Sequence, residues 1–204
     1  YLEGVSETIN NDLFFLWTGP KVISDFISQD HLKELSQVIK NPVVIWDNFY
    51  ANDYCPNKLF IGPYLFDSPN KNLMFNLTGY INTDLLIITI INSCLNKKNK
   101  IDHWEKAILK NKVPEKFLEV IQFFDRPTYS HEEKIRNIKI PDNTISNLDF
   151  LLWNWKSPLS LEWYKYLFRL KQDLELFKKS MNYNRILKTQ TYPMQKILYN
   201  RRKK

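Results

Sequence analysis

Glycine, cysteine and histidine are all scarce in this sequence. Its 204 residues include four glycines, two cysteines and three histidines. So few glycines argue against a turn-dense β-sandwich or a low-complexity linker protein. The two cysteines, Cys55 and Cys94, cannot form a disulfide framework, and no histidine lies at ligand spacing from a Cys or Glu. We therefore predict no metal site, and we expect no cofactor.

Long apolar runs are also missing. The longest, residues 85–91, is far shorter than the about 20 residues that cross a membrane, so we predict no membrane association. Hydrophobic residues nevertheless make up 44% of the chain, which is enough for a sizeable core. The length suits one domain, or one domain with an appendage.

The net charge of +7 would, on its own, favour a nucleic-acid partner. Much of the excess lies in residues 97–100, 178–179 and 201–204, where we predict a loop, a helix end and a tail. We interpret this charge as solvated and expect no nucleic acid as partner. A basic helical module that binds nucleic acid through its tail is kept as a third hypothesis.

The first hundred residues have the pattern of an α/β protein. Nearly continuous apolar segments predict buried parallel strands, with an amphipathic helix between the first two and a second helix packed on the sheet. A long irregular stretch at residues 48–72 is of a length that is usually functional. The predicted strands are residues 13–17, 43–46 and 77–81, and the predicted helices are residues 28–40, with Ser28 as N-cap, and 85–95.

After about residue 100 the apolar spacing becomes helical. Residues 160–180 predict a strong amphipathic helix, and residues 184–199 a final helix disturbed by Pro193. Residues 125–147 are polar and predict a loop. We therefore divide the chain into residues 1–100 and 101–204.

Polar and aromatic side chains cluster directly after the second predicted strand, in residues 46–54. Asp and Asn bind sugar hydroxyl groups, and Trp and Tyr pack on sugar C–H faces, so this cluster favours a saccharide site at a strand end. The alternative is that the rings pack a loop while Asp47 and Asn52 cap turns. The pair Trp153 and Trp155 favours a core or interface position over a ligand platform.

Four short segments in series form a specific pattern. They are Trp-Thr-Gly-Pro-Lys-Val at 17–22, Val-Ile-Trp-Asp-Asn at 44–48, Ala-Asn-Asp-Tyr at 51–54 and Leu-Phe-Ile-Gly-Pro-Tyr at 59–64. One such segment is a weak signal, but four in the same order are strong. Together they resemble glycoside hydrolase family 84, the hyaluronidase-like family that contains the eukaryotic O-GlcNAcases. The resemblance is tight over residues 13–66 and loose over residues 73–96.

The resemblance implies that residues 1–100 are the last three strands of a partial (β/α)8 TIM barrel and that residues 101–204 are an α-helical stalk. It also implies a β-N-acetylglucosaminidase that removes O-linked N-acetylglucosamine from Ser and Thr of cytoplasmic and nuclear proteins. The family's mechanism is substrate-assisted: the sugar's acetamido oxygen attacks the anomeric carbon and forms an oxazoline. A homodimer through the stalk helices is compatible with this fold.

The resemblance assigns five substrate-binding residues. Asn48 matches an amide that hydrogen-bonds the sugar, and Asp53 matches the carboxylate that holds the hydroxyls at carbons four and six, a charge-assisted contact. Trp46 matches a wall of the pocket. Tyr54 matches a residue that lies behind the groups in contact with the sugar. Asn82 matches a last-strand Asn near the same hydroxyls, although the family's Asn-Pro is absent after that strand. Thr83 is the alternative for this position.

The family's catalytic pair of adjacent aspartates occurs nowhere in these 204 residues. We therefore expect that the chain is the C-terminal part of a catalytic domain, that it is inactive alone, and that its open sheet makes it unstable or self-associating. The alternative is a short, catalytically dead relative that still binds glycans or glycopeptides through Asp53 and Asn48. Exo or endo preference, protein substrates and oligomeric state stay open.

Overall fold

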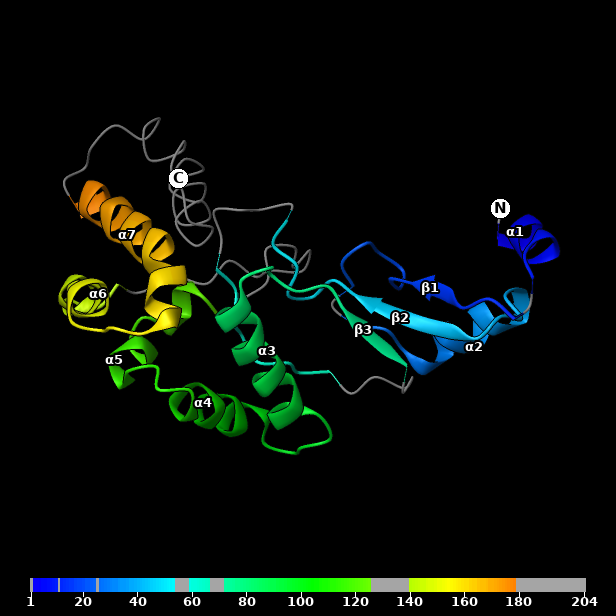
Figure 1. Cartoon of the computed structure of the whole chain (residues 1–204), viewed down its shortest axis with the longest axis horizontal. Coiled ribbons are helices and arrows are strands. Elements are labelled where there is room, and N and C mark those ends of the chain that lie inside the picture. The colour runs from blue at the N-terminus through cyan, green and yellow to red at the C-terminus, as the bar shows by residue number, and fades with distance from the viewer. Residues whose placement is uncertain are drawn as a thin grey trace, which may run out of the picture. The chain divides into compact units, whose positions relative to one another are not determined.

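The structure is a computed structural model that describes residues 2–10, 12–24, 26–53, 59–66, 72–125 and 140–178. It divides into two compact units (Figure 1). Unit 1 lies within residues 1–51 and 65–77 and holds the sheet, whereas unit 2 lies within residues 52–64 and 78–204 and holds the helices that follow the sheet.

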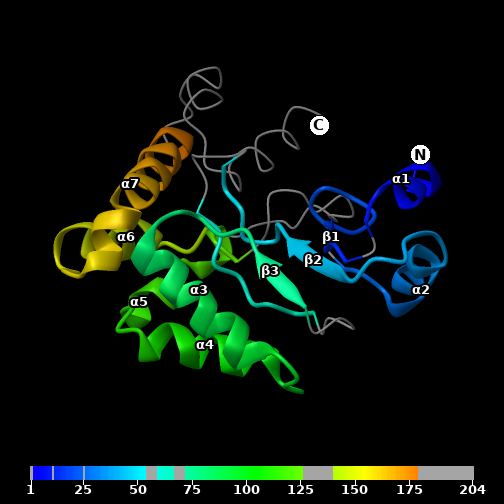
Figure 2. The ribbon, with the colours of Figure 1, turned by 45° about the vertical axis from the view of Figure 1, so that its right-hand side comes forward.

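A three-stranded parallel sheet forms the centre of unit 1, in the order β1–β2–β3 (Figure 2). Leu16 pairs with Val44, and Trp46 pairs with Met74. Parallel neighbours need a crossover, and the helix between β1 and β2 supplies it. The elements are α1 (Leu2–Thr8), β1 (Phe15–Trp17), α2 (Gln29–Val38), β2 (Val43–Asp47) and β3 (Leu73–Phe75).

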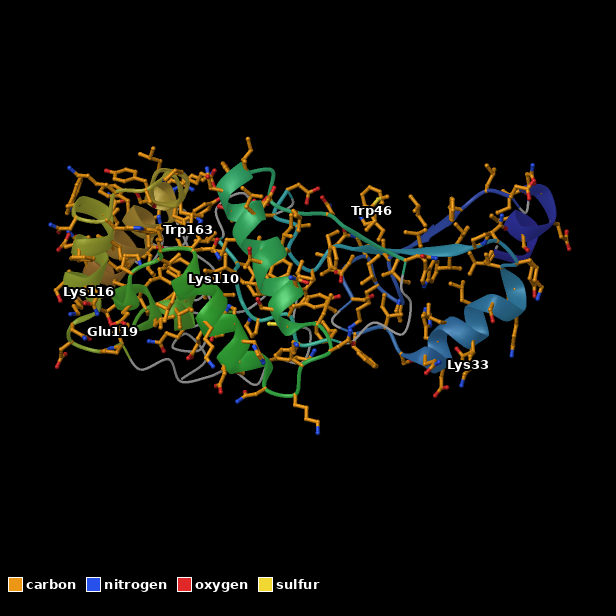
Figure 3. All side chains as sticks on the ribbon, turned by 60° about the horizontal axis from the view of Figure 1, so that its bottom comes forward. Lys33, Trp46, Lys110, Lys116, Glu119 and Trp163 are labelled. Atoms are coloured by element: carbon orange, nitrogen blue, oxygen red, sulfur yellow. The ribbon has the colours of Figure 1, made fainter. Side chains whose placement is uncertain are left out.

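The two faces of this sheet differ in what covers them. Helix α2 covers one face, where Trp17 Nε1 donates a hydrogen bond to His31 Nε2 at 2.9 Å. The opposite face carries Leu16, Trp46 and Met74, and both Leu16 and Met74 are 46% exposed. Figure 3 shows Trp46 standing on the side of the sheet away from α2. The sheet therefore presents an open apolar face.

The third strand lies at Leu73–Phe75, so the prediction of a strand at residues 77–81 is wrong. Those residues form the turn that leads into the next helix. Gly79 has a φ of +77°, and the Asp84 carboxylate accepts hydrogen bonds from the backbone N–H groups of Thr78 at 2.9 Å and Gly79 at 3.0 Å. An aspartate that binds the preceding backbone favours a turn over a strand.

The other expected strands and helices of residues 1–100 are present, with shifted ends. Ser28 is the N-cap of α2, as predicted, and accepts a hydrogen bond from the His31 backbone at 3.1 Å. The helix expected at residues 85–95 begins earlier, at Ile81, because the Asp84-bound turn starts it.

The helices of unit 2 pack around an aromatic core. Trp163 is fully buried, with its ring 5.0 Å from Phe117 and 5.5 Å from Trp155, whereas Trp153 is 58% exposed. Helix α3 packs on α4, and α6 packs on α7. The elements are α3 (Ile81–Cys94), α4 (Lys100–Lys110), α5 (Glu115–Leu118), the 3-10 turn η1 (Ile121–Phe123), α6 (Thr144–Trp153) and α7 (Pro158–Lys178).

Helix α7 confirms the strong helix predicted at residues 160–180. The helix predicted at residues 184–199 lies outside the described residues. The division of the chain at residue 100 stays a prediction. Among the described helices, none is both long and apolar enough to cross a membrane.

Candidate functional site

Asn48 connects the ends of all three strands of unit 1. It follows β2 directly, and its Nδ2 donates a hydrogen bond to the Val22 carbonyl, in the loop after β1, at 2.7 Å. Its Oδ1 accepts hydrogen bonds from Trp46 Nε1 at 2.8 Å and from Asn76 Nδ2, directly after β3, at 3.1 Å. Because parallel strands end at the same edge of a sheet, these bonds join three loops at one edge.

This edge combines amide groups with an aromatic ring. Asn48 and Asn76 are each half-buried, so they are accessible while being held in place by hydrogen bonds. The indole of Trp46 is oriented by its bond to Asn48, and its ring lies on the open face. Amides beside an indole can bind hydroxyl groups and a C–H surface together. Ligand sites of parallel α/β proteins occur at this strand end.

Asp47 has a local structural role. Its Oδ1 accepts a hydrogen bond from the backbone N–H of Phe49 at 2.8 Å, which fixes the turn after β2. The alternative that Asp47 caps a turn is therefore confirmed. Phe49 and Tyr50, which follow, are buried and meet edge to face at 5.0 Å. These two rings anchor the chain where it leaves the strand.

Asp53 belongs to unit 2, whereas Asn48 belongs to unit 1. Its side chain is exposed, which leaves its carboxylate accessible to a ligand and not sealed within hydrophobic packing. Asn52, before it, is half-buried. Tyr54, the fourth predicted site residue, lies outside the described residues.

Asn82 lies in the first turn of α3, and does not follow a strand as the sequence prediction assumed. Its Nδ2 donates a hydrogen bond to Glu162 Oε1 at 2.7 Å, and its backbone N–H donates to the same oxygen at 3.0 Å. The amide directly after the third strand is that of Asn76, which the sequence prediction missed. The signal was present, since Asn76 closes the apolar run Leu73–Phe75.

Glu162 accepts four hydrogen bonds from the first turn of α3. Besides Asn82, it accepts hydrogen bonds from the backbone N–H and the hydroxyl of Thr83, at 2.8 and 2.7 Å. Burial alone would raise the pKa of Glu162, but the hydrogen bonds from Thr83 and Asn82 together outweigh it and lower the pKa. Glu162 is therefore held as an anion that organises unit 2.

The described residues contain no group of three His, Cys, Asp or Glu side chains that could hold a metal ion. The candidate site in unit 1 is the Asn48 cluster, defined as Trp46, Asn48, Asn76 and the Val22 carbonyl. In unit 2, Asp53 is a separate candidate residue. Hydrogen-bonding amides and an indole make the Asn48 cluster suited to a neutral polyhydroxyl ligand.

Comparison with known proteins identifies the first part of the chain. A family model described as beta-N-acetylglucosaminidase matches residues 1–83. Those 83 residues are similar to this family. The family segment contains the whole Asn48 cluster and Asp53, and the resemblance to glycoside hydrolase family 84 is confirmed over it.

Similar proteins agree with this result. The chain is 48% identical over 64 residues to the Protein O-GlcNAcase of Rattus norvegicus and, equally, to that of Mus musculus. The matched part covers 31% of this chain and only 7% of each relative. The structure of an O-GlcNAc hydrolase variant from Thermobaculum terrenum matches with a TM-score of 0.53 and 18% identity, over 96% of this chain and 42% of that one. At this identity the structural match shows the α/β fold alone.

Proposed function

We propose that this chain contributes part of the sugar pocket of a β-N-acetylglucosaminidase of the protein O-GlcNAcase type. The observation that carries the proposal is the Asn48 cluster, in which one amide oxygen binds both Trp46 and Asn76 at the carboxyl edge of a parallel sheet. The match of residues 1–83 to the β-N-acetylglucosaminidase family gives the ligand class.

The three strands are proposed to be the sixth, seventh and eighth strands of a (β/α)8 barrel, and the helices after residue 100 its stalk. The open face with Leu16, Trp46 and Met74 would then face the barrel interior, where layers of apolar side chains meet. Helix α2, on the other face, would belong to the outer ring. A homodimer through the stalk helices is part of the same proposal.

The proposed substrates are Ser- and Thr-linked N-acetylglucosamine groups on cytoplasmic and nuclear proteins, cleaved by the substrate-assisted route. In this scheme Trp46 forms a wall, Asn48 hydrogen-bonds the sugar, and Asp53 accepts its hydroxyl donors, with Tyr54 behind them. We assign the last-strand amide to Asn76 instead of Asn82, because the Asn82 amide is bound to Glu162. Without an adjacent aspartate pair, these 204 residues should show no turnover.

Binding of N-acetylglucosamine to the 204-residue chain, measured by calorimetry, tests the proposal. A partial pocket should bind weakly, with a Kd of about 1 mM, because few contacts must offset the ordering cost. Asn48→Ala and Asp53→Ala should each abolish the signal. Asp30→Ala is the control, since Asp30 is an exposed acid on α2. Absence of binding, or equal affinity of all four proteins, would contradict the proposal.

A catalytically dead glycan-binding relative is the second candidate, since the amides and the indole of the Asn48 cluster can bind a sugar without catalysing its hydrolysis. It predicts the same binding to N-acetylglucosamine. The two candidates differ in the activity of the complete gene product. Release of N-acetylglucosamine from an O-linked glycopeptide by that product would reject the second candidate.

A further inference from the structure

Asn48 uses almost all of its hydrogen-bonding capacity inside the Asn48 cluster. An amide side chain has one oxygen with two lone pairs and one NH2 group with two donors. The Asn48 oxygen accepts from Trp46 Nε1 at 2.8 Å and from Asn76 Nδ2 at 3.1 Å, and Asn48 Nδ2 donates to the Val22 carbonyl at 2.7 Å. Among the described residues, these bonds leave one Asn48 N–H for a ligand and no lone pair.

Two neighbours of Asn48 fix which way its amide points. The indole N–H of Trp46 can only donate a hydrogen bond, and the main-chain carbonyl of Val22 can only accept one. The Asn48 oxygen must therefore face Trp46, and the Asn48 NH2 group must face Val22. If the amide turned over, donor would meet donor at Trp46 and acceptor would meet acceptor at Val22, so both neighbours would lose their partner.

The orientation of Asn48 also determines that of Asn76. Because Asn76 meets the Asn48 oxygen, it must turn its own NH2 group toward Asn48. The Asn76 carbonyl oxygen is then open: no group of the described residues donates to it, and the side chain is only half-buried. The backbone N–H of Asn76 donates to the Asp47 carbonyl at 2.9 Å, which holds the main chain in place. Rotation of the side-chain amide is therefore what Asn48 controls.

We propose that the indole N–H of Trp46 is a positioning group of the sugar site: through Asn48 it turns Asn76 so that the Asn76 carbonyl oxygen accepts a hydrogen bond from a sugar hydroxyl. The inference rests on the proposed function, since it takes the Asn48 cluster as part of a sugar pocket. It gives Trp46 a second role besides that of a wall. It also predicts that the ligand group beside Asn76 is a hydrogen-bond donor, because an oriented amide favours one polarity.

Replacement of Trp46 by the tryptophan analogue benzothienylalanine tests the proposal, because sulfur takes the place of the N–H in a ring of nearly the same shape. Trp46→Phe is a second variant that also lacks the N–H. Trp17→Phe is the matched control: Trp17 Nε1 also donates a hydrogen bond, at 2.9 Å, but to His31 and not to an amide of the site. All four proteins are prepared as the 204-residue chain.

The first measurement is the hydrogen exchange of the Asn76 side-chain NH2 group, recorded by NMR. Both Trp46 variants should speed this exchange, although the bond that they remove is not one of Asn76. Without the indole N–H, Asn48 and Asn76 can turn over together, and only the Val22 carbonyl opposes the turn. Trp17→Phe should leave the exchange at Asn76 unchanged.

The second measurement compares the Kd for N-acetylglucosamine with the Kd for analogues that carry fluorine in place of the hydroxyl at carbon four or carbon six. Fluorine cannot donate a hydrogen bond, so the wild type should bind at least one analogue about three- to tenfold more weakly. Both Trp46 variants should reduce this ratio, because a turned Asn76 presents its NH2 group to the fluorine. Simple loosening of the site would weaken all ligands alike and leave the ratio unchanged.

The two measurements separate the possible failures. Unchanged exchange at Asn76 in the Trp46 variants, or an equal change in Trp17→Phe, overturns the positioning role. Faster exchange with an unchanged ratio, or a wild type that does not prefer the hydroxyl sugar, overturns the inference but leaves the proposed function standing. Failure of the wild-type chain to bind N-acetylglucosamine overturns the proposed function and, with it, this inference.

Discussion

Glu162 of helix α7 caps helix α3 through Thr83. Its Oε2 accepts hydrogen bonds from the Thr83 backbone N–H at 2.8 Å and from the Thr83 hydroxyl at 2.7 Å. The N-cap residue of α3, Tyr80, makes no side-chain capping bond of its own. A carboxylate from a distant helix therefore satisfies N–H groups that a local cap would otherwise bind. Its negative charge also opposes the positive end of the α3 dipole.

Glu162→Ala should lower the free energy of unfolding by about 1–3 kcal/mol, because the first-turn N–H groups of α3 lose their acceptor. Much of Glu162 is solvent-accessible, so the lower part of this range is expected. Urea denaturation followed by tryptophan fluorescence measures the change, since the buried Trp163 is the adjacent residue. Glu175→Ala is the control, because Glu175 contacts only the surface Lys171, at 3.6 Å, among the described ion pairs. Equal losses in the two variants would contradict the capping role.

The same carboxylate predicts a pH dependence of stability. The pKa of Glu162 is lowered in the folded protein from its ordinary value of 4.5, so the unfolded chain binds the proton more readily. The stabilisation is therefore complete above pH 4.5 and is lost as the pH falls through the lowered folded pKa. The free energy of unfolding is measured by denaturation at several pH values between about 7 and about 3. It should decrease more steeply with falling pH for the wild type than for Glu162→Gln. Parallel curves would show that Glu162 does not contribute.

Thr83 is the other half of this contact and also accepts a hydrogen bond from Trp163 Nε1 at 2.9 Å. Thr83→Val keeps the shape but removes the hydroxyl. The buried indole N–H of Trp163 then loses its acceptor, and Glu162 Oε2 keeps the backbone N–H of residue 83 but loses the hydroxyl donor. We expect a loss of about 1–3 kcal/mol and a shift in Trp163 fluorescence. Thr89→Val, on the same helix, removes only a bond to the Leu85 carbonyl and should cost under about 0.5 kcal/mol. A small effect of Thr83→Val, matching this control, would mean that the hydroxyl is dispensable.

The sequence predicted the features that depend on local pattern. Apolar runs located β1 and β2, and the polar cluster after β2 located Asn48, because strand ends and their loops are adjacent in the chain. Contacts between distant residues left no such pattern. The hydrogen bond between Asn82 and Glu162 joins residues 80 positions apart, and nothing in the sequence near Asn82 indicates it. Asn82 was therefore predicted to follow a strand. The strand before Asn76 was missed because its apolar run has only three residues, between Asn72 and Asn76, whereas β1 lies within a five-residue apolar run at residues 13–17.

Gly62 illustrates a second feature that becomes clear only in three dimensions. A Cβ placed there would lie 2.5 Å from the Phe60 ring and in still closer contact with the Asp125 carbonyl. This glycine lets two backbone segments approach, next to the bond from Ile61 N–H to the Phe124 carbonyl at 3.0 Å. From the sequence, Gly-Pro-Tyr could be read only as part of a family motif. The close backbone approach that requires glycine at this position becomes visible only in the structure.

Gly62→Ala should therefore destabilise the chain, by about 1–3 kcal/mol, because one of the two backbones must move. Gly4→Ala is a control with the opposite expected sign. Gly4 lies within α1 with nothing near its missing Cβ, so alanine should stabilise that helix by about 0.5–1 kcal/mol. The two variants are compared by denaturation under identical conditions. If Gly62→Ala is neutral or stabilising, the close approach does not constrain the fold.

The open face of the sheet predicts how the chain behaves when it is isolated. Leu16 and Met74 are both 46% exposed on it, and apolar patches that lack cover promote association. We expect the sedimentation coefficient of the 204-residue chain to rise with concentration, and Leu16→Lys or Met74→Lys to suppress that rise by placing a charge on the patch. Ser36→Lys is the control, since it adds the same charge at an exposed site on α2. If the chain sediments as a monomer at every concentration and unfolds in one cooperative transition, exposure of this face neither promotes association nor destabilises the chain, and the prediction is wrong.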